Sequence, residues 1–183
     1  MFFGMPMALF PQLAEGYGGG AVVGLLYAAP SAGAVIATLS SGWSARVHRH
    51  GRAVVYAAVG WGVAIAVFGV AKWLPLALLC LVTAGGADAV SGIFRATIWN
   101  ETIPDHLRGR LAGVEMISWS SGPLLGNAEA GFASKLVGLR PSIVTGGVLC
   151  VVGSLAIAAA LPRLWSYDAR HGATAHPDII EAA

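Results

Sequence analysis

Five long apolar runs, separated by short charged segments, constrain this chain more than any other feature of its sequence. Each run is close to the ~20 residues with which an α-helix crosses the hydrocarbon core of a bilayer. The runs are Leu25–Trp43 with a lead-in from Ala21, Ala53–Ala71, Leu76–Ile98, Leu111–Ala133 and Ser142–Leu161. The sequence therefore predicts an all-α membrane protein, built as a polytopic helical bundle.

The composition agrees with a chain whose main solvent is the lipid bilayer. Only 11% of the 183 residues are charged and 56% are hydrophobic, whereas roughly a quarter of the residues in a soluble domain are charged. The formal net charge of +2 is too small for a nucleic-acid surface. Cys80 and Cys150 both lie inside apolar runs, so we expect them to pack between helices and not to form a disulfide framework. Small residues along the first run, such as Ala29, Gly33 and Ala37, predict close helix packing.

The two ends of the chain do not continue the pattern of long apolar runs. Met1–Ala14 is apolar, but it is short for a bilayer span and contains two prolines. We interpret it as the outer end of a helix whose beginning is missing. After Pro162 the composition becomes polar, and residues 164–183 are predicted to form a cytoplasmic tail. Residues 1–163 are thus predicted to be one domain with five full transmembrane helices and a truncated N-terminal one.

Positive charges are divided unevenly between the two predicted sides of the bundle. One side has Arg46, Arg49, Arg52, Arg95, Arg108, Arg110, Arg163 and Arg170, and the other has Lys72, Lys135 and Arg140. Because short cytoplasmic loops are enriched in lysine and arginine, the arginine-rich side is predicted to be cytoplasmic. We expect a multi-pass protein of the plasma membrane, and specifically of a bacterial inner membrane.

Two basic loops on the arginine-rich side carry recognisable motifs. The first reads RHGR and supplies Arg49, Gly51 and Arg52; the second, over residues 103–110, reads IPDHLRGR and supplies Arg108, Gly109 and Arg110. With their places after the second and before the fifth helix of a six-helix set, they resemble the C-terminal half of a major facilitator superfamily transporter. Residues 9–14 (LFPQLA), 24–30 (GLLYAAP) and 122–131 (GPLLGNAEAG) are similar to its enterobactin-exporter-like branch, whose members export siderophores or drugs.

The resemblance implies that the helices correspond to helices 7 to 12 of a 12-helix fold. In such folds the substrate binds near the midplane, between two halves that rock against each other. A small molecule is then the implied substrate, and an N-terminal six-helix half is an implied missing partner. The sequence departs from the family at Arg46, four residues after Gly42, where members usually have Asp. Only the positive charge of that family loop is therefore kept.

Asp88 is the strongest single candidate for a functional residue, because it lies near the middle of the third full run. A carboxylate at a helix centre costs roughly 2.5 to 3.5 kcal/mol on insertion scales, so it normally faces a bundle interior or a watery cavity. We expect Asp88 to exchange protons and to couple proton entry to substrate exit. The alternative is a carboxyl group that only holds helices together.

Arg95 is expected to pair with Glu115, since each lies about one turn inside the membrane from the same loop. This ion pair would form a cytoplasmic gate, unless the Arg95 side chain extends to the interface instead. Asp88 lies seven residues before Arg95, roughly 10 Å away along a helix axis. Direct pairing between Asp88 and Arg95 is therefore not expected.

The fourth run carries a polar stripe that is interrupted at Gly122-Pro123, where a freed backbone carbonyl permits a kink. The stripe consists of Ser118, Ser120, Ser121, Asn127 and Glu129. We expect this helix to line a pore, with Ser118, Ser121 and Asn127 joining Asp88 along a substrate or proton pathway. The alternative is that the stripe makes polar contacts between helices.

No pattern in the sequence points to catalysis, to a metal or to a cofactor. His48 and His50 are two residues apart, not one helical turn apart, and no Ser, His and Asp can be assembled at one depth of the membrane. An enzyme is therefore not expected. The predicted function is proton-coupled efflux of a small molecule by one half of a transporter. The alternative is a non-transporting membrane fragment, or an accessory subunit that only binds a partner half.

Overall fold

In a computed structural model, the chain is described over residues 6–47, 49–103 and 105–161. The elements in chain order are the 3-10 helix η1 (Pro6–Leu9), α1 (Phe10–Glu15), α2 (Gly20–Leu39), the 3-10 helix η2 (Ser41–Arg46), α3 (His50–Val70), α4 (Leu74–Thr102), α5 (Asp105–Val137) and α6 (Leu139–Ala160). The described residues contain no strand. The prediction of an all-α helical bundle is therefore confirmed.

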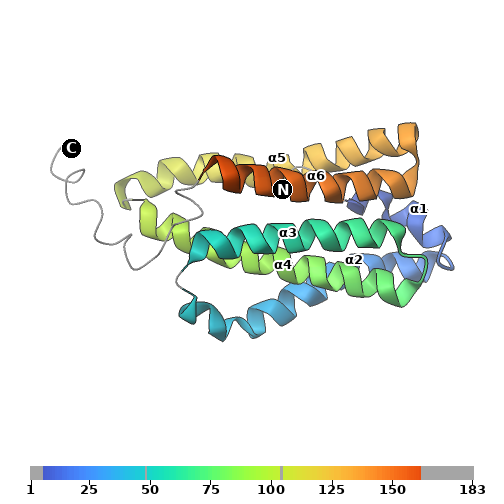
Figure 1. The fold of residues 1–183 in the computed structure, drawn as a ribbon, viewed down its shortest axis with the longest axis horizontal. Coiled ribbons are helices and arrows are strands. Elements are labelled where there is room, and N and C mark those ends of the chain that lie inside the picture. Colours follow the sequence, from blue (N-terminus) through green and yellow to red (C-terminus); the bar gives the residue numbers. More distant parts are fainter. Residues whose placement is uncertain (1–5, 48, 104, 162–183) are drawn as a thin grey trace.

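Successive long helices run in opposite directions (Figure 1), and the most closely packed pairs are α3 with α4, α3 with α6, and α2 with α4. One end of the bundle, which we call the arginine-rich end, holds residues 41–47, 49–52, 100–103 and 105–110. The opposite end, which we call the turn end, holds residues 15–20, 71–73 and 138. Among the described residues, Arg46, Arg49, Arg52, Arg108 and Arg110 lie at the arginine-rich end, and Lys72 lies at the turn end, with Lys135 and Arg140 close to Gly138. This agrees with the predicted division of positive charge, except that Arg163 and Arg170 lie outside the described residues.

Four helices of the described chain are long and apolar enough to cross a membrane: α2, α3, residues 74–100 of α4, and α6. The remaining predicted span, Leu111–Ala133, lies within α5, which has 33 residues and is therefore about 50 Å long at 1.5 Å per residue. Its polar stripe makes it less apolar than the other four helices. Four of the five full runs thus each correspond to one long helix, whereas the first, Leu25–Trp43, continues from α2 into the 3-10 helix η2.

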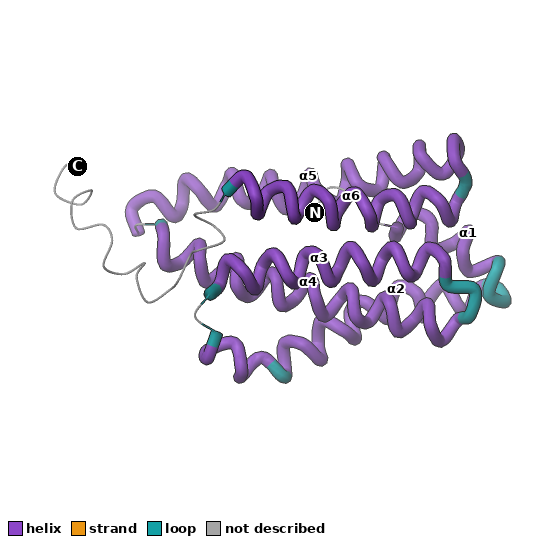
Figure 2. Tube along the Cα trace, viewed as in Figure 1, coloured by secondary structure: helices purple, strands orange, loops and turns teal. Residues whose placement is uncertain are grey.

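Two connections between the long helices, before and after α5, are shorter than the sequence predicted (Figure 2). The expected turn over residues 134–141 is reduced to Gly138, because α5 continues to Val137 and α6 begins at Leu139. The φ angle of Gly138 is 92°, a left-handed conformation that glycine adopts without steric cost. The sequence analysis ended each helix where its apolar residues ended, whereas polar residues can continue a helix beyond the hydrocarbon core.

The expected loop over residues 99–110 is also largely helical. Residues 99–102 belong to α4, and α5 begins at Asp105. Arg108, Gly109 and Arg110 therefore lie in the first two turns of a helix and not in a loop, which corrects the prediction. Likewise Gly51 and Arg52 lie in the first turn of α3.

Glycines allow α2 and α4 to pack with their backbones almost in contact. A Cβ atom at Gly33 of α2 would lie 1.9 Å from the carbonyl oxygen of Val82, and one at Gly85 of α4 would lie 2.0 Å from that of Pro30. Real Cβ atoms do not approach an oxygen so closely, so both positions require glycine. The predicted close packing of small residues along the first run is confirmed at Gly33.

The same arrangement joins α3 to α6. A Cβ atom at Gly147 would lie 2.6 Å from the Gly62 carbonyl oxygen, and one at Gly62 would lie 2.9 Å from the Gly147 carbonyl oxygen. Because α3 also packs along α4, it is covered on two sides, and its Trp61, Ile65 and Phe68 side chains are buried. The core of the bundle is thus centred on α3.

The described part of the N-terminal segment forms two short helices, η1 and α1, and its interpretation as the outer end of a longer helix stays a prediction. α1 has six residues and packs against α2. The ring of its buried Phe10 meets the rings of Tyr27 and Phe68 edge-on, at centroid distances of 5.0 and 6.0 Å. The predicted tail over residues 164–183 lies outside the described residues, as do residues 1–5.

Candidate functional site

Asp88 lies in α4 and forms an ion pair with Arg95 of the same helix. Arg95 Nη2 lies 3.8 Å from Asp88 Oδ1, and the Arg95 and Asp88 side chains are 40% and 52% exposed. The expectation that these two residues would not pair directly is therefore wrong. It considered only their spacing along the helix axis and neglected the length of the arginine side chain, which in a helix extends back toward the N-terminus.

Arg95 makes a second contact along α4. Its Nε donates a hydrogen bond to the Ser91 carbonyl oxygen, 3.3 Å away and one turn earlier in the helix. The guanidinium group is thus held against its own helix, and its charge is balanced by that of Asp88. The ion pair between Arg95 and Glu115 of α5, which the sequence suggested as a gate, stays a prediction.

The polar stripe of α5 is only partly described. Asn127 Oδ1 accepts a hydrogen bond from the Ala8 backbone N–H at 3.2 Å, which links α5 to η1. Ser121 is half-buried, and the helix continues without a break through Gly122-Pro123. The side chain of Ser118 is not among those that the structure describes. Since Asn127 contacts η1 and Asp88 contacts Arg95, the two belong to separate groups in this structure, and their common pathway stays a prediction.

Arg108 of the IPDHLRGR motif caps the C-terminal end of α4. Its Nη2 donates to the Asn100 carbonyl oxygen at 3.1 Å, and its Nε donates to that of Ile103 at 3.4 Å. A positive charge is stabilising near the C-terminus of a helix, where backbone carbonyls lack helical partners. Gly109 and Arg110 are exposed on α5. Sequence analysis used the motif for the topology and for the family resemblance, and it missed this local role of Arg108.

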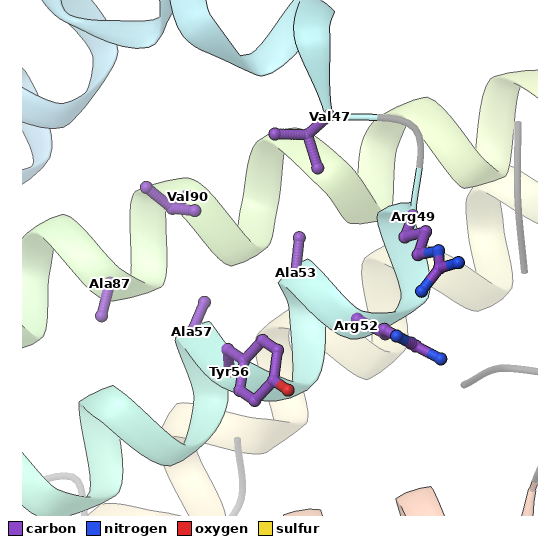
Figure 3. A pocket seen from close by; sticks show the side chains of 8 residues that line it. All are labelled: Val47, Arg49, Arg52, Ala53, Tyr56, Ala57, Ala87 and Val90. Atoms are coloured by element: carbon purple, nitrogen blue, oxygen red, sulfur yellow. The ribbon is translucent and has the colours of Figure 1, made fainter. Parts of the chain in front are cut away.

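The RHGR motif borders a pocket at the arginine-rich end, between α3 and α4 (Figure 3). The pocket has a volume of about 550 Å³. It is lined by Val47 before α3, by Arg49, Arg52, Ala53, Tyr56 and Ala57 at the start of α3, and by Ala87 and Val90 of α4. Gly51, which is buried, keeps the start of α3 free of a side chain at that position.

A group of contacts around Arg140 joins three elements at the turn end. Arg140 Nη1 donates hydrogen bonds to the carbonyl oxygens of Gly69 and Ala71, and Nη2 contacts the Tyr17 hydroxyl at 3.4 Å. The guanidinium carbon lies 5.6 Å from the centre of the Tyr17 ring, and the Tyr17 hydroxyl donates to the Ala71 carbonyl oxygen. We call this group the Arg140 clasp. Sequence analysis missed it because its partners are far apart in the chain.

Comparison with known proteins places this architecture in a family. Residues 1–177 match the Major Facilitator Superfamily. Enterobactin exporter EntS of Citrobacter koseri is 32% identical over 149 residues, which cover 80% of this chain and 36% of that protein. EntS of Shigella flexneri is 29% identical over 151 residues, covering 81% and 37%. EntS of Escherichia coli O81 is 30% identical over 149 residues, covering 80% and 36%.

The chain thus spans a little over a third of the length of these curated relatives. No solved structure matches it. The apolar helices of the bundle, together with these relatives, identify a multi-pass membrane protein. Because the family match covers residues 1–177 of the 183, and with them every described helix, the chain belongs to the Major Facilitator Superfamily.

Proposed function

We propose that the chain is the C-terminal six-helix half of an exporter for a small molecule such as a siderophore or a drug. The observation that carries this proposal is the similarity to proteins named enterobactin exporters, at about 30% identity over 80% of the chain. Transport by alternating access requires two halves around one central site. The proposed partner is accordingly a second set of six helices.

The surface of α5 supports the need for a partner. This helix packs against α6 and η1, and large apolar side chains along its length are exposed. They are Val114, Met116, Ile117, Leu124, Leu125, Phe132, Leu136 and Val137. Side chains of this kind are compatible with lipid or with other transmembrane helices, and a second half would cover part of this surface.

Within this function we assign proton exchange to Asp88. While Asp88 is charged, it holds Arg95 along α4. Uptake of a proton by the carboxylate would remove the electrostatic attraction between Asp88 and Arg95. Arg95 can then turn to Glu115 of α5 and form the predicted gate at the arginine-rich end. Exchange of partners by Arg95 would couple proton binding to a change between α4 and α5.

The transport proposal is tested by reconstituting the chain in liposomes, alone and together with a co-expressed N-terminal six-helix half. We expect accumulation of labelled siderophore, driven by a pH gradient, only when both halves are present. Transport by the chain alone would contradict the assignment as a half. Binding of the other half without any transport would instead identify an accessory subunit.

The role of Asp88 is tested in the same two-part system with Asp88→Asn, which keeps the size of the side chain and removes its titratable charge. We expect loss of accumulation driven by a pH gradient while substrate binding is retained. Glu15→Gln, which removes an exposed carboxylate at the turn end, is the matched control. Normal proton-driven export by Asp88→Asn would show that Asp88 does not carry the coupling.

We also propose that the arginine-rich end faces the cytoplasm of a bacterial cell, because lysine and arginine are enriched in cytoplasmic loops. Single cysteines can be introduced after Cys80 and Cys150 are replaced by serine. In intact cells, Lys72→Cys should react with an impermeant thiol reagent, and Arg110→Cys should react only after the membrane is opened. The reverse labelling pattern would invert the orientation.

A further inference from the structure

The pocket at the arginine-rich end has an almost wholly apolar lining, and two arginines border it at one end. Figure 3 shows Arg49 and Arg52 at one end of the row of lining side chains, with Tyr56 beside Arg52. The rest of the lining is aliphatic: Val47, Ala53, Ala57, Ala87 and Val90. The described lining includes no acidic residue. A ligand that fits this pocket therefore combines a negative group with a hydrocarbon segment.

The place of the pocket along α3 matches the two parts of a phospholipid. α3 is a candidate membrane span from His50 to Val70, so Arg49 and Arg52 lie where the span begins. Ala57 follows His50 by seven residues, which places it roughly 10 Å further along the helix axis. The arginines thus lie at the depth of lipid phosphates, while Ala57 lies at the depth where the acyl chains begin.

We propose that this pocket binds an anionic phospholipid of the adjacent leaflet. Its phosphate would accept hydrogen bonds from Arg49 and Arg52, which can each bind a phosphate through two parallel N–H groups. One acyl chain would lie against Ala53, Ala57 and Val90. Basic pockets between transmembrane helices on the cytoplasmic side are known to bind lipid head groups.

A free phosphate ion fits the pocket less well than a lipid. It would use the two guanidinium groups but leave the aliphatic lining of a cavity of about 550 Å³ in contact with water. A zwitterionic lipid would place its own positive charge near two arginines. An anionic lipid avoids both costs. Once bound, it would contact the segment before α3, the first turns of α3, and α4, and so hold these elements together independently of any transported substrate.

The proposal is tested by native mass spectrometry of the full chain, purified in detergent and stripped of lipid. Phosphatidylglycerol and phosphatidylcholine are added in parallel. We expect one phosphatidylglycerol to bind at least tenfold more tightly than phosphatidylcholine. Arg49→Gln and Arg52→Gln should each weaken phosphatidylglycerol binding roughly tenfold, since a hydrogen bond to a charged group contributes a factor of this order. Arg110→Gln, which removes an exposed arginine at the same end, is the control and should bind normally.

Two further variants separate the lipid from a phosphate ion and from a folding defect. Ala57→Leu occupies part of the aliphatic lining and should weaken lipid binding while both arginines are kept. The double variant Arg49→Lys, Arg52→Lys keeps the charge and should bind severalfold more weakly than the parent chain. Circular dichroism and gel filtration check that each variant is folded.

The proposal is overturned if the folded glutamine variants bind phosphatidylglycerol as tightly as the parent chain does. It is also overturned if millimolar inorganic phosphate displaces the lipid completely and Ala57→Leu has no effect. The ligand would then be a phosphate anion and not a lipid.

Discussion

α3 and α5 are both long helices of one bundle, but their surroundings are very different. α3 packs against α4 on one side and α6 on the other, and its Phe68 is only 1% exposed. α5 packs against α6 and the short η1, and its Met116 and Phe132 are 72% and 68% exposed. The largest apolar side chains in the middle of α3, such as Trp61, Ile65 and Phe68, are buried within this chain, whereas many large apolar side chains on α5 are exposed.

This difference separates the part of the molecule that provides stability from the part that is available to lipid or to other proteins. Lipid tails are as apolar as leucine side chains, so helix association in a membrane depends on close packing and hydrogen bonds and not on removal of apolar surface from water. The glycine contacts of α2 with α4 and of α3 with α6 provide such packing. Substitutions there should therefore be far more damaging than substitutions on α5.

The largest effect is expected for Gly85→Ala in α4. The new methyl group would lie 2.0 Å from the Pro30 carbonyl oxygen, so α2 and α4 would have to separate. Overpacking typically costs about 1 to 3 kcal/mol and occasionally more, and we expect at least the upper value. Thermal unfolding in detergent, followed by circular dichroism, measures the loss. Gly92→Ala in the same helix meets no atom within 4 Å and should be neutral; equal effects of the two would contradict the packing argument.

A smaller effect is expected for Gly147→Ala in α6. Its methyl group would lie 2.6 Å from the Gly62 carbonyl oxygen and from the Ala66 nitrogen, a milder clash than at Gly85. We expect a loss of about 1 to 2 kcal/mol in the free energy of unfolding. Gly153→Ala lies on the same helix in open space and provides the comparison. If both variants unfold at the same temperature as the parent chain, the contact between α3 and α6 is looser than described.

Arg140→Gln tests whether the turn end adds to the stability of α3. The change removes the hydrogen bonds to the carbonyl oxygens of Gly69 and Ala71. We expect a loss of about 1 kcal/mol, because the site is partly exposed and water can replace some of the contacts. Denaturant titration compares it with Lys135→Gln, a change at an exposed lysine near the same end. A larger effect from the lysine change would refute the role of the Arg140 clasp.

The smallest effect on the isolated chain is expected for Phe132→Ala in α5. Substitutions at exposed positions usually change stability by less than about 0.5 kcal/mol. Phe68→Ala in α3 should cost several times more, which would confirm the contrast between the two helices. Should the proposed second half be supplied, co-purification measures whether Phe132→Ala weakens its binding. A strong destabilisation of the chain alone by Phe132→Ala would show that α5 has internal contacts that its exposure does not reveal.

The long helices were predictable because a chain in lipid must satisfy its backbone hydrogen bonds internally, and apolar runs of the right length leave few alternatives. The ends of the helices were less predictable: Gly138 forms almost the whole of a turn that was expected to be eight residues long. The contact of Gly85 with Pro30 depends on the register of two helices, which local sequence does not encode.

The candidate site was predicted less completely than the fold. Asp88 and Arg95 were both singled out, but their pairing depends on the side-chain conformation of an arginine. The sequence analysis counted Arg140 only as a charge, because its hydrogen-bond partner Ala71 lies 69 residues earlier in the chain and local sequence does not show that the two meet. Interactions of this kind become visible only when the helices are placed relative to one another.

The Arg140 clasp has a consequence for the synthesis of the protein. Ala71 precedes Arg140 by 69 residues, so at about 5 to 20 residues per second the ribosome adds Arg140 roughly 3 to 14 s after Ala71. During this interval the carbonyl groups of Gly69 and Ala71 must be hydrated or paired with other donors. The arrival of α6 in the membrane then delivers the arginine and the glycine surface that covers α3 together. The insertion of one helix thus completes the contacts of a turn that was made long before it.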